Sequence, residues 1–424
     1  MADSAAGTSL LSRLHQQLKP AALAALAAIE QACLDDGARL YLVCGTLRDL
    51  VLQRDPLDID LAVEGDATSI AHRVAEQLGA RAVVHQRFGT AKLSSRDFQF
   101  DIVATRRETY PHPGSLPQVE PATLIEDLAR RDFAINAFAM QLAPEPGEIV
   151  DPFRGIDDLR SGLVRVLHER SFQDDATRML RGARYATRFG FKLQRDTEAL
   201  LRRDLPYLKR ISGPRLRREL ALIFAEPEAV PAVELAHRLG ILETIHPALR
   251  LRGDVAARWA EALRGHHEAP LDETGFCILA DPRDEGTAAS VTQWLHLTGR
   301  VERALLDLVR LRGLSDKLTA ASGSPAAVVE LLEHFAPAAV WALSVLDGSA
   351  AGTTCRDYLA HWRHKRPLLS GDDLLALGVA PGVAVGEMIR QLRRAQLQVN
   401  GMTRDQEIEL VRASLPGGGA ARGR

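Results

Sequence analysis

The stretch "LVCGTLRDLVLQRDPLDIDLAVEG", from Leu42 to Gly65, places two aspartates one residue apart inside an apolar segment. Side chains alternate between the two faces of a β-strand, so Asp58 and Asp60 share one face. Two neighbouring carboxylates repel each other unless a cation lies between them, and Mg²⁺ takes carboxylate oxygens together with substrate phosphates. The pattern predicts a metal-binding strand end at Asp58 and Asp60. The competing interpretation is a solvated strand end that carries two charges.

A glycine turn precedes the two aspartates. Gly45 and Thr46 lie between an apolar run and a short helical segment, and Arg48 lies in the first turn of that segment. Backbone N–H groups at a helix N-terminus, beside a residue without a side chain, form a cradle for anions. The turn predicts a triphosphate site, although many such glycines serve only chain reversal. Asp101, in "FQFDIV", is a weaker candidate for a third metal-binding carboxylate.

The composition is that of a soluble globular protein, with 424 residues of which 46% are hydrophobic and 25% charged. The formal net charge is −2, so a nucleic-acid surface has to come from a regional excess of basic residues. The four cysteines show no C-x-x-C spacing, which argues against a zinc site and fits a reducing compartment. No signal segment and no apolar run of about 20 residues is present. We expect a cytoplasmic protein without a membrane partner.

Strand and helix signals are segregated along the chain. A helix over 20–36 is followed by short apolar runs that predict strands up to about residue 104. The stretch "RRETYPHPGSLPQVEP" contains four prolines and predicts a loop. From "DLARRDFAINAFAM" onward the apolar spacing predicts helices almost to the end. We therefore expect an α+β fold, with a mixed α/β unit that ends near residue 145 and a helical remainder.

The segment "RRDFAINAF" combines groups that bind phosphate and ribose. Helical spacing would place Asp132 and Asn136 on one face, with Arg131 beside them. An arginine can grip phosphate oxygens bidentately, and aspartate and asparagine can bind ribose hydroxyls. The competing interpretation is a surface cluster of ion pairs.

The segment "SFQDDATRMLRGARYATRFGF" offers groups that can read a base edge. Asp175 and Arg178 are three residues apart, hence neighbours on a helix, and present an acceptor beside a forked donor. Cytosine and adenine each present an amino donor beside a ring acceptor, whereas guanine and uracil present the opposite order. The pair therefore predicts selection of C and A, unless it is an ordinary ion pair.

A basic region overlaps these motifs. Between Arg160 and Arg218 the sequence contains 16 lysines or arginines and 6 acidic residues. Such an excess can neutralise several phosphates of an RNA, although a solvated helical face has the same composition. A second basic cluster, "HWRHKRP", covers 361–367 and is a further candidate for RNA contact.

The ordered set of motifs resembles the class II tRNA nucleotidyltransferase and bacterial poly(A) polymerase family. The resemblance covers about 38–225 and rests on six motifs in order. They are "LVCGTLRDLVLQRDPLDID", "RFGTAKL", "DLARRDFAINAFAM", "DPFRGIDDLRSGLVRVL", "SFQDDATRMLRGARYATRFGF" and "GPRLRREL".

The resemblance implies a catalytic nucleotidyltransferase head at 1–145 with a five-stranded mixed sheet. It further implies a helical neck and body with nucleotide-templating and RNA-binding regions at 146–245, and a helical C-terminal body and tail at 246–424. It also implies that Asp58 and Asp60 bind catalytic Mg²⁺, and that the Pro-rich stretch Arg107–Pro121 is a mobile loop that helps to switch between C and A. The nucleotide site expected for CTP and ATP comprises Gly45, Thr46, Arg48, Arg131, Asp132, Asn136, Asp175, Arg178, Arg181 and Arg184. The contacts expected for the tRNA 3′ end and the rest of the RNA are Arg188, Arg215, Arg217, Arg218, Lys365 and Arg366.

Three positions depart from the pattern of the family. Cys44 replaces the first glycine of a Gly-Gly pair, Arg154 replaces a glycine of "DPFGG", and Asp174-Asp175-Ala176 replaces Glu-Asp-Pro. None of them removes an expected metal ligand or base reader. The "SFxDD-x-TR" form resembles members that add only CC or only A, so the sequence leaves full CCA addition, CC addition and A addition open. The sequence is also compatible with a poly(A) polymerase and with a non-catalytic RNA-binding protein on the same fold.

Overall fold

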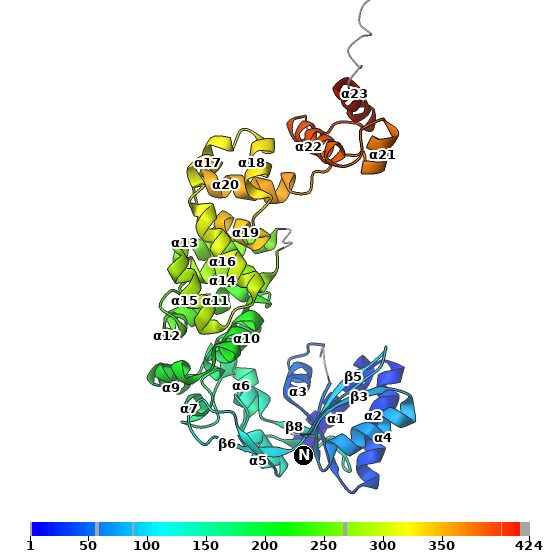
Figure 1. Cartoon of the computed structure of the whole chain (residues 1–424). Coiled ribbons are helices and arrows are strands. Elements are labelled where there is room, and N and C mark those ends of the chain that lie inside the picture. Colours follow the sequence, from blue (N-terminus) through cyan, green and yellow to red (C-terminus); the bar gives the residue numbers. More distant parts are fainter. Residues whose placement is uncertain (1, 56–58, 87–88, 266–268, 400, 416–424) are drawn as a thin grey trace, which may run out of the picture. The chain divides into compact units, whose positions relative to one another are not determined.

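The computed structural model of the chain describes residues 2–55, 59–86, 89–265, 269–399 and 401–415 (Figure 1). Asp58 therefore lies outside the described residues. The chain divides into two compact units, Met1–Ile245 and His246–Arg424. The expected finer boundary near residue 145, inside the first unit, stays a prediction.

Within the described residues, a seven-stranded mixed sheet forms the centre of the first unit. Its strand β2 (Ile59–Glu64) runs antiparallel to β1 (Arg39–Val43) and parallel to β5 (Gln99–Ala104). Leu61, Ala62 and Val63 are all fully buried, so β2 is covered on both faces. The strand order is β3-β4-β5-β2-β1-β8-β9, and the other strands are β3 (Arg81–His85), β4 (Thr90–Ser94), β8 (Ala139–Ala143) and β9 (Ile149–Val150).

Helices cover the sheet of the first unit (Figure 1). α2 (Pro20–Asp35) and α4 (Ala67–Leu78) pack against each other and against the strands. Asp66 caps α4 by accepting the N–H groups of Thr68 and Ser69, which ordinarily lack partners at a helix start. The other helices of the head are α1 (Ala2–Gln17), α3 (Cys44–Val51) and α5 (Leu124–Ala129).

The rest of the first unit is mostly helical. Its elements are α6 (Gly155–Ser161), β10 (Leu163–Val164), α7 (Ser171–Asp174), α8 (Arg178–Phe189), β11 (Lys192–Leu193), α9 (Arg195–Asp204), the 3₁₀ helix Leu205–Arg210, α10 (Gly213–Phe224), α11 (Ala229–Arg238) and α12 (Ile241–Ile245).

The described sheet has two more strands than the expected five, and part of the difference lies in a segment that we expected to be helical. After α5 the chain forms only a 3₁₀ turn at Ala134–Asn136 and then enters β8. All residues of β8 are buried. A strand buried on both faces is a continuous apolar run, which periodicity cannot distinguish from a buried helix.

The Pro-rich stretch was wrongly expected to be a loop throughout. β6 (Arg106–Thr109) and β7 (Gln118–Pro121) pair as an antiparallel hairpin, joined by residues 110–117. Arg107 and Glu120 face each other across the hairpin in an ion pair of 2.5 Å. Three of the four prolines lie in the connection, where the missing N–H groups cost no strand hydrogen bonds.

The helix expected across Asp175 and Arg178 is broken between α7 and α8. Asp175 has extended dihedral angles (φ −142°, ψ 98°). Its Oδ1 accepts hydrogen bonds from the N–H of Thr177 at 3.0 Å and from the Thr177 hydroxyl at 2.7 Å. An aspartate that bonds to the backbone two residues ahead forms a local turn and competes with helix hydrogen bonds.

The second unit is helical in its described residues. α19 (Pro337–Leu346) packs against α14 (Leu271–Ala280), α16 (Gly299–Arg312) and α20 (Ala350–Asp357). The other elements are α13 (Gly253–Arg264), α15 (Glu285–Leu295), α17 (Ser315–Ala321), α18 (Pro325–Leu332), a π-helix at Tyr358–Trp362, α21 (Gly371–Ala376), α22 (Val383–Gln398) and α23 (Arg404–Ser414).

Two further properties concern the whole described chain. In these ranges no single helix is long and apolar enough to cross a membrane; α18 and α19 meet that criterion only as a pair, which is bent by 118°. The thiols of Cys33, Cys44, Cys277 and Cys355 are free.

A buried carboxylate joins the last helices of the second unit. Glu407 of α23 is fully buried and accepts the N–H groups of Leu368 and Leu369 at 2.8–3.0 Å. Its Oε1 also accepts the side-chain amide of Gln396 at 2.7 Å. These bonds hold the start of α21 and the end of α22 against α23.

Replacing Glu407 by alanine leaves these buried donors without partners, at a cost of about 1–3 kcal/mol for each unsatisfied group. We expect Glu407→Ala to lower the protection from hydrogen exchange across 368–398, measured by mass spectrometry. Glu409→Ala, an exposed change on the same helix, is the matched control. Equal protection in the two variants would contradict the anchoring role.

Candidate active site

A cavity of about 520 Å³ opens in the first unit. It is lined by strand ends and turns of the head together with α8 and α10. Nine arginines line it: Arg48, Arg130, Arg131, Arg178, Arg181, Arg184, Arg188, Arg215 and Arg218. The other lining residues are Cys44, Gly45, Asp60, Glu108, Tyr110, Asp132, Asn136, Asp175, Thr177, Tyr185 and Glu219.

The glycine turn lies at one wall of this cavity. A Cβ atom on Gly45 would lie 3.4 Å from Nη2 of Arg48 and 3.5 Å from Oδ2 of Asp60, so a side chain here would touch both groups at ordinary contact distance. Thr46 is buried, and its hydroxyl accepts the N–H of Asp60 at 2.8 Å. Thr46 thus joins α3 to β2 and does not itself line the cavity.

The carboxylates of β2 and β5 lie on one face of the sheet. Asp60 and Asp101 are direct partners in the parallel register of these two strands. Asp101 also forms an ion pair of 3.5 Å with Lys92 of β4. The described residues contain no group of three or more His, Cys, Asp or Glu that could hold a metal ion, and the predicted ligand Asp58 is not among them.

Arg48 is buried and links three elements. It bonds to Asp49 at 2.9 Å and donates to Oδ1 of Asn136 at 2.8 Å. Its guanidinium lies over the ring of Phe189 at 4.5 Å and near that of Tyr185 at 5.7 Å. A cation above an aromatic face is attracted by the ring quadrupole. Arg48 therefore holds the glycine turn against α8 as well as lining the cavity.

Arg131, Asp132 and Asn136 come together as expected, although no helix carries them. Nδ2 of Asn136 donates to Oδ1 of Asp132 at 3.0 Å, and Arg181 donates to Oδ2 of Asp132 at 2.8 Å from Nε. Burial raises the pKa of Asp132, but the charge of Arg181 and the bond from Asn136 outweigh it and bring the pKa down to about 2. Asp132 is thus ionised at neutral pH.

Arg131 is held from two sides. Its Nη2 donates to Asp127 at 2.7 Å, and its Nη1 contacts the thiol of Cys44. Burial lowers the pKa of Arg131, but its contacts with Cys44 and with the charged carboxylate of Asp127 outweigh burial and raise that pKa above the ordinary value. Burial also raises the pKa of the Cys44 thiol, so that thiol stays protonated at neutral pH.

Asp175 and Arg178 both line the cavity but do not bond to each other through their side chains. Oδ1 of Asp175 accepts from Thr177 and forms an ion pair of 2.9 Å with Arg215 of α10. No described residue hydrogen-bonds to Oδ2 of Asp175. Nη2 of Arg178 donates to the carbonyl oxygen of Arg130 at 2.7 Å. Both side chains are therefore oriented by neighbours, with polar atoms left over for a ligand.

The arginines of α8 are partly neutralised by acids of α10 and the turn after it. Arg184 and Arg188 contact Glu226 at 3.2 and 3.3 Å. Glu219 lies 3.9 Å from Arg181 and from Arg184, and burial raises its pKa.

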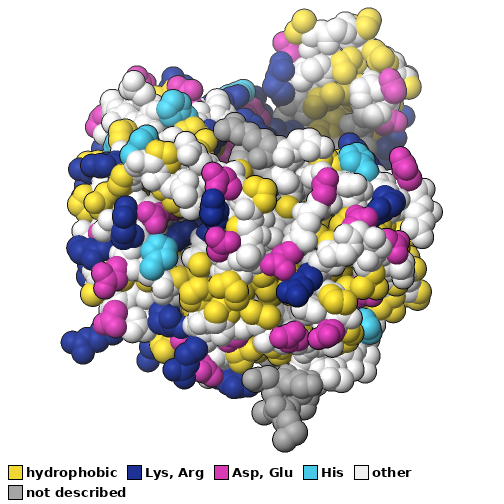
Figure 2. Space-filling model, turned by 90° about the horizontal axis from the view of Figure 1, so that it is seen from below, with side chains coloured by type: hydrophobic (Ala, Val, Ile, Leu, Met, Phe, Trp, Pro, Cys, Tyr) yellow, Lys and Arg dark blue, Asp and Glu magenta, His cyan; other side chains and the backbone are white. Residues whose placement is uncertain are grey.

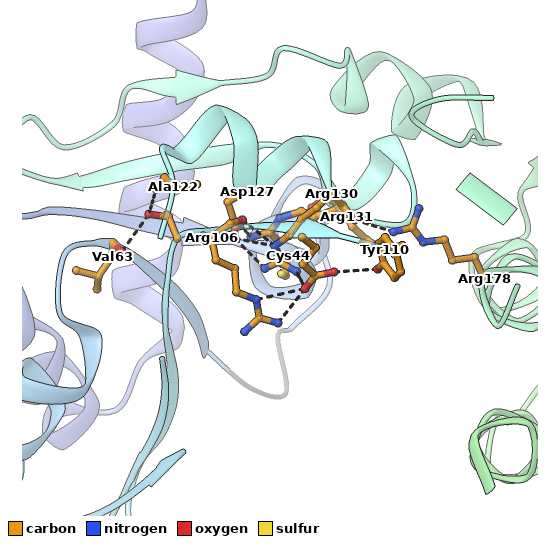
Figure 3. A network of polar contacts seen from close by, with 12 residues as sticks. Cys44, Val63, Arg106, Tyr110, Ala122, Asp127, Arg130, Arg131 and Arg178 are labelled. Carbon is orange, nitrogen blue, oxygen red and sulfur yellow. Dashed lines mark hydrogen bonds and ion pairs between the residues drawn. The ribbon is translucent and has the colours of Figure 1, made fainter. Parts of the chain in front are cut away.

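A network from the Pro-rich hairpin was missed by the sequence reasoning (Figure 3). Glu108 accepts from Arg130 at 2.9 Å and from the hydroxyl of Tyr110 at 2.9 Å. Asp127 is fully buried, and the charges of Arg131 and Arg130 lower its pKa against the effect of burial. The only sequence signal for these residues was an acidic and an aromatic residue beside the prolines, which is typical of many loops.

The residues expected to contact RNA are distributed over both units. Arg188, Arg215 and Arg218 line the cavity, whereas Arg217 does not. Lys365 and Arg366 belong to the second unit, where Arg366 donates to the carbonyl oxygens of Arg363 and Lys365. On the face shown in Figure 2, Lys and Arg side chains gather toward the left of the view, with Asp and Glu scattered among them.

Two family descriptions match parts of the chain. "Poly A polymerase head domain" covers residues 40–165, and "Probable RNA and SrmB- binding site of polymerase A" covers residues 190–251. A solved structure, "The structure of CCA-adding enzyme apo form II", has a TM-score of 0.78 at 27% identity and covers 96% of this chain and 98% of its own.

Three curated relatives are similar over different lengths. An A-adding tRNA nucleotidyltransferase of Aquifex aeolicus is 41% identical over 49% of this chain, which spans only 26% of that relative. An A-adding tRNA nucleotidyltransferase of Halalkalibacterium halodurans is 31% identical over 81% of each chain. A CC-adding tRNA nucleotidyltransferase of Deinococcus radiodurans is 33% identical over 89% of each chain. With the last two relatives matched over most of their length, the chain belongs to the family of the tRNA nucleotidyltransferases.

Proposed function

We propose that the chain adds C, A or both to the 3′ end of tRNA, using CTP and ATP and releasing pyrophosphate. The observation that carries this proposal is a single cavity that joins Asp60 and the glycine turn to the possible base readers Asp175 and Arg178. The names of the relatives supply the acceptor, tRNA, and the nucleotides C and A. The incorporation experiment described below determines how many nucleotides are added.

The charge of the cavity suits a nucleoside triphosphate. Nine arginines face five acidic residues across its lining, so the cavity is electropositive and attracts a polyanion. Arg131 is fixed by Asp127, which leaves its guanidinium pre-oriented for phosphate oxygens. Asp132 and Asn136 supply ionised and amide oxygens for ribose hydroxyls. The glycine turn lets the phosphates approach the backbone at α3.

Asp175 and Arg178 act as the base readers. Oδ2 of Asp175 accepts the amino group of cytosine or adenine, and Arg178 donates to the ring acceptor beside it. Guanine and uracil present a donor where Arg178 also donates, so they leave buried donors unpaired. This arrangement selects C and A without a nucleic-acid template.

The residues present fit Mg²⁺. Asp60 lies beside Gly45, and its register partner Asp101 brings a second carboxylate to the same face, with Asp58 as the further predicted ligand. A Mg²⁺ ion held by these carboxylates would supply a lower pKa for the RNA 3′ hydroxyl and charge neutralisation for the leaving pyrophosphate. The chain's own contribution is positioning: the hydroxyl, the α-phosphate and the leaving group are held in line by the arginines and the glycine turn.

A set of basic residues contacts the RNA, some at the cavity and some away from it. Arg188, Arg215 and Arg218 line the cavity, and Arg217, Lys365 and Arg366 lie elsewhere. All six neutralise phosphates, which makes tRNA affinity fall as salt rises. The free thiols are those of a protein in a reducing compartment, so we place the chain in the cytoplasm.

The proposal is tested by incorporation of labelled CTP and ATP, singly and together, into tRNA transcripts that end at the discriminator base, after C and after CC. We expect C or A to be added to at least one transcript, with the products read by sequencing. Completion of all three transcripts to CCA identifies a CCA-adding enzyme. A stop at CC identifies a CC-adding enzyme, and use of only the CC-ended transcript identifies an A-adding enzyme. A long A tail on any RNA identifies a poly(A) polymerase, and no incorporation with Mg²⁺ present overturns the proposal.

If Asp58 and Asp60 hold the catalytic metal, replacing them impairs nucleotide transfer but not tRNA binding. We expect Asp60→Asn, alone or with Asp58→Asn, to lower transfer by roughly 1,000-fold or more, because several kcal/mol of charge stabilisation are lost. Binding of tRNA, measured by filter binding, stays close to that of the unaltered chain. Asp101→Asn tests the weaker ligand in the same assay. Joint loss of transfer and tRNA binding in Asp60→Asn would count against the metal role.

If Asp175 and Arg178 read the base, replacing either residue changes which nucleotides are incorporated. We expect Asp175→Asn and Arg178→Ala each to reduce the preference for C and A over G and U by roughly 5- to 150-fold, since a good bidentate contact contributes about 1–3 kcal/mol. The measurement is incorporation of each of the four nucleotides at equal concentration. Asp174→Asn, next in the chain but outside the cavity lining, is the matched control. An unchanged preference in the Asp175 and Arg178 variants would contradict their role.

A further inference from the structure

Two aromatic rings are found among the described residues that line the cavity, those of Tyr110 and Tyr185. Asp175 and Arg178 can read only the edge of a base, and the two flat faces of that base remain apolar surfaces. A base held by its edge alone leaves these faces in water. Aromatic side chains cover such faces by stacking, which works for every base because every base has a π-face.

The ring of Tyr185 is already covered by neighbours. It is stacked on Phe189 at 6.0 Å and meets Phe133 edge to face at 5.9 Å. The guanidinium groups of Arg184 and Arg181 lie over it at 5.0 and 5.6 Å. Only 9% of the residue is exposed. Tyr185 is therefore part of the wall and offers no face to a ligand.

Tyr110 is placed differently. It follows β6 and is half-buried, and its hydroxyl donates to Oε2 of Glu108 at 2.9 Å. The side chain of Glu108 is itself only 8% exposed and is held by Arg106 and Arg130. The orientation of the phenol is thus fixed at its polar end. None of the other described residues places an aromatic ring or a guanidinium over the ring of Tyr110.

The position of Tyr110 is next to the base readers. Burial raises the pKa of its hydroxyl, and the charges of Glu108, Arg178 and Asp175 all act on that pKa. Figure 3 shows the guanidinium of Arg178 reaching toward Arg130 beside the Tyr110 ring. The cavity therefore brings an uncovered aromatic ring to the two groups that can read a base edge.

We propose, on the basis of the nucleotide transfer proposed above, that Tyr110 stacks on the base of the incoming ribonucleoside triphosphate. The hydrogen bond to Glu108 sets the plane of the ring, and the ring covers one face of the base while Asp175 and Arg178 read its edge. A purine has the larger face, so stacking supports ATP more than CTP. Glu108 acts as the positioning residue of Tyr110.

The test compares equilibrium binding of ATP, CTP and inorganic tripolyphosphate to the full chain in the presence of Mg²⁺. We expect Tyr110→Ala to weaken ATP binding by roughly 5- to 150-fold and CTP binding by less, as loss of one base stack does elsewhere. Tripolyphosphate has no base, so its affinity stays unchanged. Tyr110→Phe keeps the ring but loses the hydrogen bond to Glu108, so we expect its ATP affinity to lie between those of Tyr110→Ala and the unaltered chain.

The control variant is Leu116→Ala, an exposed change in the same hairpin that does not line the cavity. Equal weakening of ATP and tripolyphosphate in Tyr110→Ala would mean a structural role and overturn the proposal, as would unchanged ATP binding. A second measurement needs no variant: photolabelling of the unaltered chain with 8-azido-ATP attaches the label to the tryptic peptide that contains Tyr110. Label found only elsewhere also overturns the proposal.

Failure of this inference is distinguishable from failure of the proposed function. Binding of ATP and of tripolyphosphate is measured without RNA, whereas the proposed function is tested by incorporation into tRNA. An unaltered chain that binds ATP through Tyr110 but extends no RNA would overturn the transfer and keep the stacking.

Discussion

The first unit depends on the pairing of buried arginines with buried carboxylates. Burying an unpaired charge costs several kcal/mol, so each guanidinium in the cavity wall needs a partner. Asp127 is the centre of this pairing: it is fully buried and binds Arg130 and Arg131 at 2.7 Å each. It also accepts the N–H of Arg106 at 3.2 Å, which fixes the start of the Pro-rich hairpin. One carboxylate thereby positions Arg131, the arginine that we propose for phosphate binding, and the hairpin that carries Tyr110.

The same pairing extends from the head to α8. The carbonyl oxygen of Arg130 accepts from Arg178, and Asp132 accepts from Arg181 one helical turn later. Arg48 completes the connection by lying over Phe189. These contacts join groups from the glycine turn, the 3₁₀ turn and α8 across one cavity. A shift of α8 relative to the sheet would have to break several charge-assisted hydrogen bonds at once, which gives the site its rigidity.

Local patterns predicted much of the head, and the misses have physical causes. Sequence periodicity and turn residues reveal structure that depends on neighbouring residues. This is the case for the strand at Asp60, the glycine turn and the amphipathic helices. β8 was missed because full burial removes the alternation of a strand. The structure explains why the family pattern has glycine at positions 44 and 154. Cys44 and Arg154 have φ values of 55° and 58°, in the left-handed region that favours glycine. This chain keeps the left-handed conformation at both positions with residues that have a Cβ atom, so the backbone is strained there.

Charge counting along the sequence overstates the RNA surface for a specific reason. The window from Arg160 to Arg218 holds 16 basic and 6 acidic residues, but several of its arginines have acidic partners outside the window. Asp132 forms an ion pair with Arg181, and Glu226 forms ion pairs with Arg184 and Arg188. Arg215 is paired with Asp175 inside the window. Sequence neighbours cannot reveal such pairs because the fold creates them. In the function proposed above, the excess charge serves first the cavity, where a triphosphate would meet arginines that are already held in place. Only the remainder would then be available to the RNA backbone.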